Sequence, residues 1–366
     1  MFSVNFYLGL TWGVKMSLYP IKIKALEWVD GKIRWINTKL LPGVEAYEES
    51  DNYERIAKAI EDLEIRGAPA IGVAAALGVA TTVYNAPSSD VDQVKALAFK
   101  AIERLRRTRP TAYNLFWALK QMEEVLNKSY ANVDELKKAV IDKALEIYQQ
   151  DIEINTRIGE FGEKLIDDGD TVLTHCNAGA LATVALGTAL AIIRVAWYKG
   201  KKINVIATET RPVLQGARLT VWELKKEGIP VTLITDNMVG YIMHRGLVNK
   251  VIVGADRILI DGHVLNKIGT YTIAIAAKRH EIPFYVAAPT STIDPHTPVD
   301  NVIIEERDPN EVRKVLGKIS ITVEDVPVLN PAFDIVPPDL VTAIVTEKGV
   351  VGAPYTVSIK KILGIK

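Results

Sequence analysis

Cysteine and net charge are both scarce in this chain of 366 residues. Cys176 is the single cysteine, which excludes a disulfide within the chain and a zinc site built on cysteines. The 44 basic side chains balance the 44 acidic ones, so no excess charge favours a nucleic acid or an anionic membrane. We therefore expect neither partner, and we expect the cytoplasm as the compartment.

Several motifs that mark cofactor-dependent enzymes are missing. No G-x-G-x-x-G follows the first strand of the second half, no G-x-x-x-x-G-K-[ST] loop occurs, and the five histidines lack the spacing of metal ligands. These gaps disfavour nicotinamide, P-loop and zinc chemistry. We expect no metal or other cofactor.

Long apolar runs are few, and none predicts a membrane span. Residues 1–16 are too short for one and lack the basic start and cleavage site of a signal peptide. We interpret Met1–Lys15 as a non-standard extension or a mis-assigned start, without function, because Met16 opens a more ordinary pattern. Ala180–Trp197 contains two threonines and Arg194, and we expect it to form a buried helix.

The pattern of apolar residues predicts an α/β protein with two domains, since a single core rarely grows beyond about 250–300 residues. Residues 1–166 begin with a small sheet and continue as a helical domain. In residues 167–366, short apolar runs alternate with helical segments, which is typical of a parallel sheet covered on both faces.

Individual elements can be placed from turns and periodicity. Asp30-Gly31 predicts a hairpin within residues 21–40. The expected helices are 53–63, 70–83, 89–107, 112–126 and 133–165. The expected strands of the second domain are TVLTHC, KINVIATE, PVTLITD, KVIVGAD, PFYVAAP and NVIIEE.

Polar residues follow several of these strands, and parallel strands bring such ends to one edge of the sheet. They are Cys176, Glu209, Asp236, Asp256 and Pro289-Thr290-Ser291. Each has a plainer alternative: Cys176 can pack as a small hydrophobe, and Asp236 can cap the next helix. Asp256 lies in the apolar run VIVGADRILI, so it must be paired, hydrogen-bonded or protonated. His175 points to the opposite face from Cys176, and we expect it to be structural rather than half of a Cys–His dyad.

Basic residues near helix starts indicate a phosphate site. Arg66-Gly67-Ala68 opens an Ala-rich helix, where free N–H groups and the helix dipole favour an anion. Arg109 precedes a second expected helix, and Asn266-Lys267 is expected to begin a third. Small residues at such places also permit close helix packing, which is the alternative.

Taken in order, the motifs resemble those of the methylthioribose-1-phosphate isomerase family, from about Leu26 to the C-terminus. The matching strings are RGAPAIG at 66–72, RPTAYNL at 109–115, HCNAGALAT at 175–183, ETRPVLQGARLTVWEL at 209–224, TDNMVG at 235–240, and GADRI with NKIGTY between 254 and 271. Tyr113, Val239 and the extra N-terminal residues depart from the family pattern.

The resemblance implies an N-terminal helical domain, a C-terminal Rossmann-like domain and a homodimer. The wider family includes ribose-1,5-bisphosphate isomerases and regulatory subunits of a translation-initiation exchange factor, which are the alternative functions. CNAG and ETRPVLQGARL resemble the methylthioribose branch more closely.

The implied reaction converts 5-methylthioribose 1-phosphate, a sugar phosphate, to 5-methylthioribulose 1-phosphate in methionine salvage. By resemblance, Asp256 is the proton donor and Cys176 is the second catalytic group. The implied substrate-binding residues are Arg66, Gly67, Ala68, Arg109, Gln215, Asn266 and Lys267. Whether the hydrogen moves as a proton or as a hydride stays open.

Overall fold

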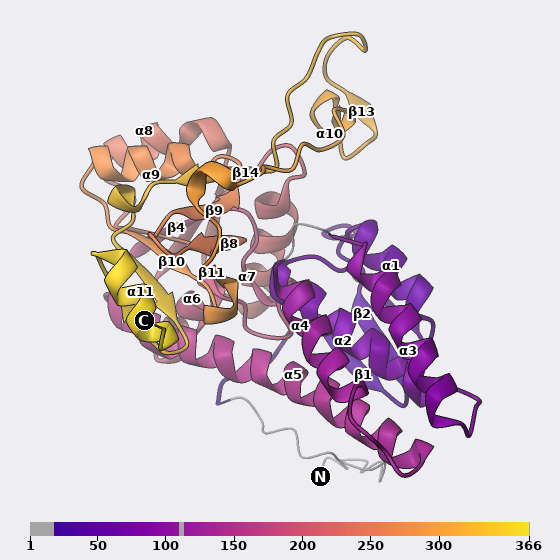
Figure 1. The fold of residues 1–366 in the computed structure, drawn as a ribbon. Helices are drawn as coiled ribbons and strands as arrows, with labels where there is room; N and C mark the ends of the chain where they lie inside the picture. Colours follow the sequence, from indigo (N-terminus) through magenta and orange to yellow (C-terminus); the bar gives the residue numbers. More distant parts are fainter. Residues whose placement is uncertain (1–17, 110–112, 366) are drawn as a thin grey trace, which may run out of the picture.

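A computed structural model describes residues 18–109 and 113–365 of the chain (Figure 1). The expectation for Met1–Lys15 lies outside these residues. The first part opens with an antiparallel sheet of β1 (Leu26–Val29), β2 (Lys32–Ile36) and β3 (Tyr47–Ser50). Asp30 and Gly31 have φ angles of 47° and 80°, which form the predicted tight turn of the hairpin.

Five helices follow this sheet, close to their predicted places. They are α1 (Tyr53–Glu61), α2 (Ala68–Tyr84), α3 (Val91–Arg106), α4 (Tyr113–Leu126) and α5 (Val133–Gly162). α2 is buried on nearly all sides because its alanines and glycines let its neighbours approach closely. A Cβ on Gly72, for example, would lie 2.7 Å from the carbonyl oxygen of Asn114.

α5 packs against both parts of the molecule (Figure 1). Its first half lies in the core of the helical part, and Ile158 lies in the core around the large sheet. The division of the chain at residue 166 therefore remains our prediction, since one helix spans the two cores.

The second part is built on a sheet of seven strands among the described residues. Their order is β16-β15-β10-β7-β4-β5-β6, and only β16 runs antiparallel. The strands are β4 (Thr171–Thr174), β5 (Asn204–Thr208), β6 (Val231–Ile234), β7 (Lys250–Val253), β10 (Phe284–Ala287), β15 (Ala343–Thr346) and β16 (Gly349–Val351). Numbered along the chain, the parallel strands follow the doubly wound order 3-2-1-4-5-6, which reverses between β4 and β7.

Helices cover both faces of this sheet, as the apolar strands predict. Alternate residues of one strand face opposite sides: Val172 belongs to one core and Leu173 to the other. One face packs against α5, α6 (Ala189–Tyr198) and α7 (Val221–Glu227). The other packs against α8 (Val239–His244), α9 (Thr270–Arg279) and α11 (Tyr355–Leu363). Among the described residues, no helix is both long and apolar enough to cross a membrane.

Two helix predictions were wrong. Ala180–Trp197 is not one helix, because Gly187 takes a φ of 83° and α6 begins only at Ala189. Asn266 and Lys267 do not begin a helix. They end β9 (Val264–Lys267), and α9 starts after Gly269, whose φ of 100° ends the extended segment.

The predicted strand NVIIEE was also wrong, since Ile303 is 88% exposed and Val302–Glu305 pairs with no strand. A small sheet went unpredicted, with the order β11 (Ile293–Asp294), β8 (Arg257–Leu259), β9 and β14 (Phe333–Val336). An arm carrying α10 (Asn310–Arg313), β12 (Lys314–Val315) and β13 (Ile319–Ser320) projects from the body (Figure 1).

Candidate active site

A cavity of about 740 Å³ lies between the two parts of the molecule. Eight of the nine predicted site residues line it: Arg66, Gly67, Ala68, Arg109, Cys176, Gln215, Asp256 and Lys267. Asn266 lines a small adjoining cavity that shares Arg66, Cys176 and Asp256 with the large one. The structure thus brings together all nine residues, although they come from segments far apart in the sequence.

The two proposed catalytic residues flank the reversal point of the sheet. Cys176 follows β4 and Asp256 follows β7, and these strands are hydrogen-bonded neighbours. Such a reversal opens a crevice at the carboxyl ends of the strands, which is where ligands bind in open α/β sheets. Asp236 does not cap the helix that follows it: its carboxylate accepts hydrogen bonds from the N–H groups of Thr210 and Arg211, after β5, at 2.8 and 2.6 Å.

Cys176 is 8% exposed and has a φ of 61°, in the left-handed region that non-glycine residues rarely adopt. Two hydroxyls hold this conformation. The Cys176 N–H donates to Thr210 Oγ1 at 2.9 Å, and Thr220 Oγ1 donates to the Cys176 carbonyl at 2.6 Å. Backbone held in this way by its surroundings is a common feature of active sites.

The Asp256 carboxyl lies among cations and is partly buried in the cavity wall. Burial raises its pKa above the ordinary value, and the positive charges of Lys267, Arg66 and Arg109 oppose that rise. A carboxyl with a raised pKa keeps its proton to higher pH, which suits a general acid.

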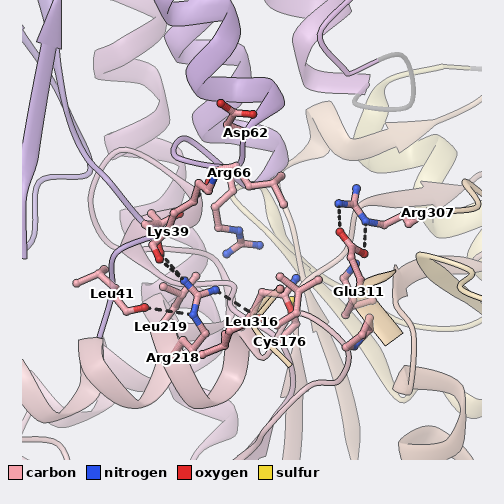
Figure 2. A pocket seen from close by; sticks show the side chains of 18 of the residues that line it. Lys39, Leu41, Asp62, Arg66, Cys176, Arg218, Leu219, Arg307, Glu311 and Leu316 are labelled. Atoms are coloured by element: carbon pink, nitrogen blue, oxygen red, sulfur yellow. Dashed lines mark hydrogen bonds and ion pairs between the residues drawn. The ribbon is translucent and has the colours of Figure 1, made fainter. Parts of the chain in front are cut away.

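Basic side chains outnumber acidic ones around the cavity. Nine of the described lining residues are Lys or Arg and three are Asp or Glu. Burial lowers the pKa of both Arg109 and Lys267, because it removes water from around these cations. Figure 2 shows the Arg66 guanidinium pointing toward the middle of the cavity, where it also donates to the Asn177 carbonyl at 2.8 Å. This excess of positive charge suits a phosphate.

The start of α2 adds backbone donors to these cations. Gly67 has a φ of 92°, and a Cβ there would lie 2.5 Å from Ala182, so this position requires glycine. No side chain caps the helix, which leaves its first N–H groups for an anion.

Gln215 has a buried side-chain oxygen without a hydrogen-bond partner among the described residues. It precedes a π-helical turn (η3, Gly216–Thr220), a distortion that is frequent at functional sites. Gly216 allows the turn to approach β5, because a Cβ there would lie 1.8 Å from the Thr208 carbonyl oxygen. An unpaired buried acceptor beside a cavity suits a substrate hydroxyl.

Sequence reasoning missed part of the cavity wall. Arg218 donates to the carbonyls of Thr38, Lys39 and Leu41 at 2.8, 3.1 and 3.2 Å, and thereby fixes the loop 38–44 (Figure 2). The arm contributes Arg307, Glu311 and Leu316. Arg218 stood within a matching motif, whereas the loop and the arm carry no motif that could have revealed them.

Comparison with known proteins gives a consistent family. Residues 64–353 match the initiation factor 2 subunit family. The chain is 51% identical to a methylthioribose-1-phosphate isomerase of Thermotoga maritima, covering 94% of this chain and 99% of that protein. It superimposes on the 5-methylthioribose 1-phosphate isomerase of Pyrococcus horikoshii OT3 with a TM-score of 0.89, at 40% identity over 94% and 97% of the two chains. It also superimposes on subunit delta of the A. fulgidus translation initiation factor eIF-2B with a TM-score of 0.86, at 47% identity over 94% of this chain and 100% of that one.

Proposed function

The chain belongs to the initiation factor 2 subunit family, and we propose that it is the isomerase of methionine salvage that converts 5-methylthioribose 1-phosphate to 5-methylthioribulose 1-phosphate. The observation that carries this proposal is the placement of Cys176 and Asp256 on either side of the sheet reversal, beneath the basic wall of one cavity. Relatives with this activity cover almost the whole chain at about half identity.

The substrate explains why the site needs an acid and a second group. Phosphate on the anomeric oxygen prevents spontaneous opening of the sugar ring. Asp256 donates a proton to the ring oxygen as the bond from that oxygen to C1 breaks. Cys176 acts beside C1 and C2, where one hydrogen moves from C2 to C1. The C2 hydroxyl loses its proton as C2 becomes the ketone carbon, which balances the proton given to the ring oxygen. Turnover in D₂O separates two routes, because proton transfer through an enediol introduces deuterium at C1 and hydride transfer does not.

The remaining site residues bind the substrate. Arg66, Arg109 and Lys267 neutralise the phosphate together with the α2 N-terminus at Gly67 and Ala68, and Asn266 completes that end of the site. Gln215 accepts a hydrogen bond from a sugar hydroxyl.

Part of the cavity wall suits a methylthio group. Leu41, Leu219 and Leu316 line the cavity, and the guanidinium donors of Arg218 are directed at backbone carbonyls. Lys39, Lys314 and Lys318 line the same cavity, so turnover of the two substrates decides between a thioether and a second phosphate.

Turnover of the two sugar phosphates by the purified protein tests the proposal. We expect conversion of 5-methylthioribose 1-phosphate and little conversion of ribose 1,5-bisphosphate, and the reverse preference would reassign the substrate. Cys176→Ser and Asp256→Asn should each abolish most of the turnover. If both variants keep near-wild-type rates, the catalytic assignment is wrong.

A non-catalytic role in translation is the second candidate, because the similar A. fulgidus chain is named as an initiation-factor subunit. That role predicts tight binding to a translation GTPase and no isomerase activity in the same preparation.

We further propose a cytoplasmic homodimer with no nucleic-acid or membrane partner. Exposed apolar side chains on α8 and α9, such as Tyr241 and Ile275, supply a surface for a second copy. Light scattering after size exclusion would give twice the mass of 40.3 kDa, and a monomer at that mass would reject the dimer.

A further inference from the structure

A hydrogen-bonded network of buried side chains lies behind Cys176, and the proposed chemistry does not use this network. It consists of His175, Thr208 and Thr210, each at most 1% exposed. Thr210 Oγ1 lies 3.3 Å from Thr208 Oγ1, which lies 2.6 Å from His175 Nδ1. His175 Nε2 lies 2.8 Å from the carbonyl oxygen of Ile268.

The direction of the two hydrogen bonds of His175 follows from its partners. The Ile268 carbonyl can only accept, so a neutral His175 carries its hydrogen on Nε2 and accepts at Nδ1 from Thr208. The Thr210 hydroxyl lies within reach of both the Thr208 hydroxyl and the Thr208 carbonyl, at 3.3 and 3.4 Å. Thr210 in turn uses its oxygen to accept the N–H of Cys176. Burial lowers the pKa of His175, which agrees with a neutral ring.

At the end away from Cys176, the network reaches Ile268, the residue that follows Lys267. The Ile268 carbonyl belongs to the turn between β9 and α9, and His175 packs against that turn as well as bonding to it. A Cβ on Gly269 would lie 3.1 Å from His175 Cε1, so the turn leaves room only for glycine at its φ of 100°. The imidazole therefore contacts both the segment that carries Cys176 and the segment that carries Lys267.

We propose that His175 is a positioning residue that holds Cys176 and Lys267 in one fixed arrangement. It acts on Cys176 through Thr208 and Thr210, and on Lys267 through Ile268. This inference rests on the proposed function for its effect on turnover. The left-handed backbone of Cys176 needs such support, because a non-glycine residue relaxes from that region unless its surroundings hold it.

Matched substitutions at Thr210 and His175 test the proposal. Thr210→Val removes the acceptor of the Cys176 N–H at nearly constant volume, and Thr210→Ser keeps it. His175→Leu removes both hydrogen bonds of the imidazole, the one to Thr208 and the one to Ile268. His175→Asn keeps an amide that can bond to Thr208, so it serves as the second pair if Thr210→Val does not fold.

Two readouts separate positioning from general stability. We expect Thr210→Val and His175→Leu to lower kcat about 10- to 100-fold with less than about a threefold change in KM, because small misplacements of catalytic groups cost this much. Since Cys176 is the single cysteine, its alkylation by iodoacetamide is unambiguous, and we expect it to become several-fold faster in both variants. Thr210→Ser and His175→Asn should restore most of both properties.

Each outcome bears on the proposal. Wild-type kcat and alkylation in folded Thr210→Val and His175→Leu would overturn it. A loss of kcat that Thr210→Ser does not restore, with an unchanged alkylation rate, would also overturn it. If the wild type turns over neither sugar phosphate, the proposed function fails. The alkylation rates still test whether the network of His175, Thr208 and Thr210 keeps Cys176 in place.

Discussion

At the residue scale, the two residues proposed as catalytic have unusual surroundings. Cys176 has a backbone that few non-glycine residues adopt, and Asp256 is a partly buried carboxyl whose pKa is raised. Their places at the ends of apolar strands could be predicted from the sequence, whereas their catalytic roles rest on the family resemblance and stay a proposal. Arg218 could not be predicted in this way, since an arginine on an amphipathic segment fits a solvated surface equally well.

The raised pKa of Asp256 predicts a pH dependence. A general acid must carry its proton, so kcat/KM should fall as pH rises through the pKa of Asp256. Because burial raises that pKa, the fall should come at higher pH than for an ordinary carboxyl. A pH–rate profile of the wild type checks this, with Asp256→Asn as the variant that should lose the dependence together with most of the activity. A rate that increases across the same pH range would contradict the role of Asp256 as an acid.

A substitution of Gln215 should affect protein stability and substrate binding differently. The buried oxygen of Gln215 has no hydrogen-bond partner in the part of the chain that the structure describes, so Gln215→Leu should leave the melting temperature unchanged or raise it. The lost hydrogen bond to substrate should raise KM about tenfold, since about 1.4 kcal/mol corresponds to a factor of ten. Thermal melts and steady-state kinetics on the same preparation measure both effects. An unchanged KM would show that this oxygen does not contact the substrate.

At the element scale, the segment after β4 is held by buried charge rather than by helical structure. Glu223 accepts hydrogen bonds from Ala180, Leu181 and Asn177, and it also pairs with Arg194 at 2.7 Å. Glu223 thereby satisfies two backbone N–H groups in a segment that belongs to no α-helix. The sequence could not predict this, because the partner lies some forty residues further along the chain.

Arg194 should therefore be hard to replace. It is 1% exposed and pairs with both Glu223 and Glu227, so Arg194→Met leaves two buried carboxylates without their cation. We expect a loss of about 3–5 kcal/mol in the free energy of unfolding, measured in urea. Lys226→Met, which breaks an exposed pair with Glu45, should cost less than about 1 kcal/mol. Equal losses in the two variants would contradict the role of burial.

Asp151 on α5 predicts a second pH effect, this time on stability. Its carboxylate accepts the N–H of Val184 at 2.8 Å, and burial raises its pKa from 3.8 to about 7. The folded state thus binds the proton more tightly than the unfolded state. This contribution to stability is complete below about pH 4 and is lost as pH rises through about 7.

Asp151→Asn isolates this contribution because asparagine keeps an acceptor and cannot ionise. Above pH 7.5 the variant should be more stable than the wild type by roughly 2–4 kcal/mol, and the difference should shrink toward pH 5. Melting temperatures across that pH range provide the measurement. A difference that does not vary with pH would show that Asp151 does not titrate on unfolding.

At the scale of the whole molecule, the cavity exists only because two parts of the chain meet. Arg66 and Arg109 come from the helical part, whereas Cys176, Asp256 and Lys267 come from the large and small sheets. Apolar patterning predicted the parallel sheet and the helices, and strand ends predicted one edge of the site. The positions of the loop 38–44 and the arm could not be predicted from such patterns, because tertiary packing alone places them at the cavity.

The contact of Arg218 with the loop 38–44 should therefore govern substrate capture. Arg218→Ala removes the donors to Thr38, Lys39 and Leu41 and loosens one wall of the cavity without touching Cys176 or Asp256. We expect KM to rise about tenfold with a smaller change in kcat, and the loop to become more sensitive to limited proteolysis. Lys32→Ala, which removes an exposed contact with Glu49, is the control and should behave as the wild type. If Arg218→Ala instead lowers kcat and leaves KM unchanged, the guanidinium acts on the reacting atoms rather than on the fit between the two parts of the molecule.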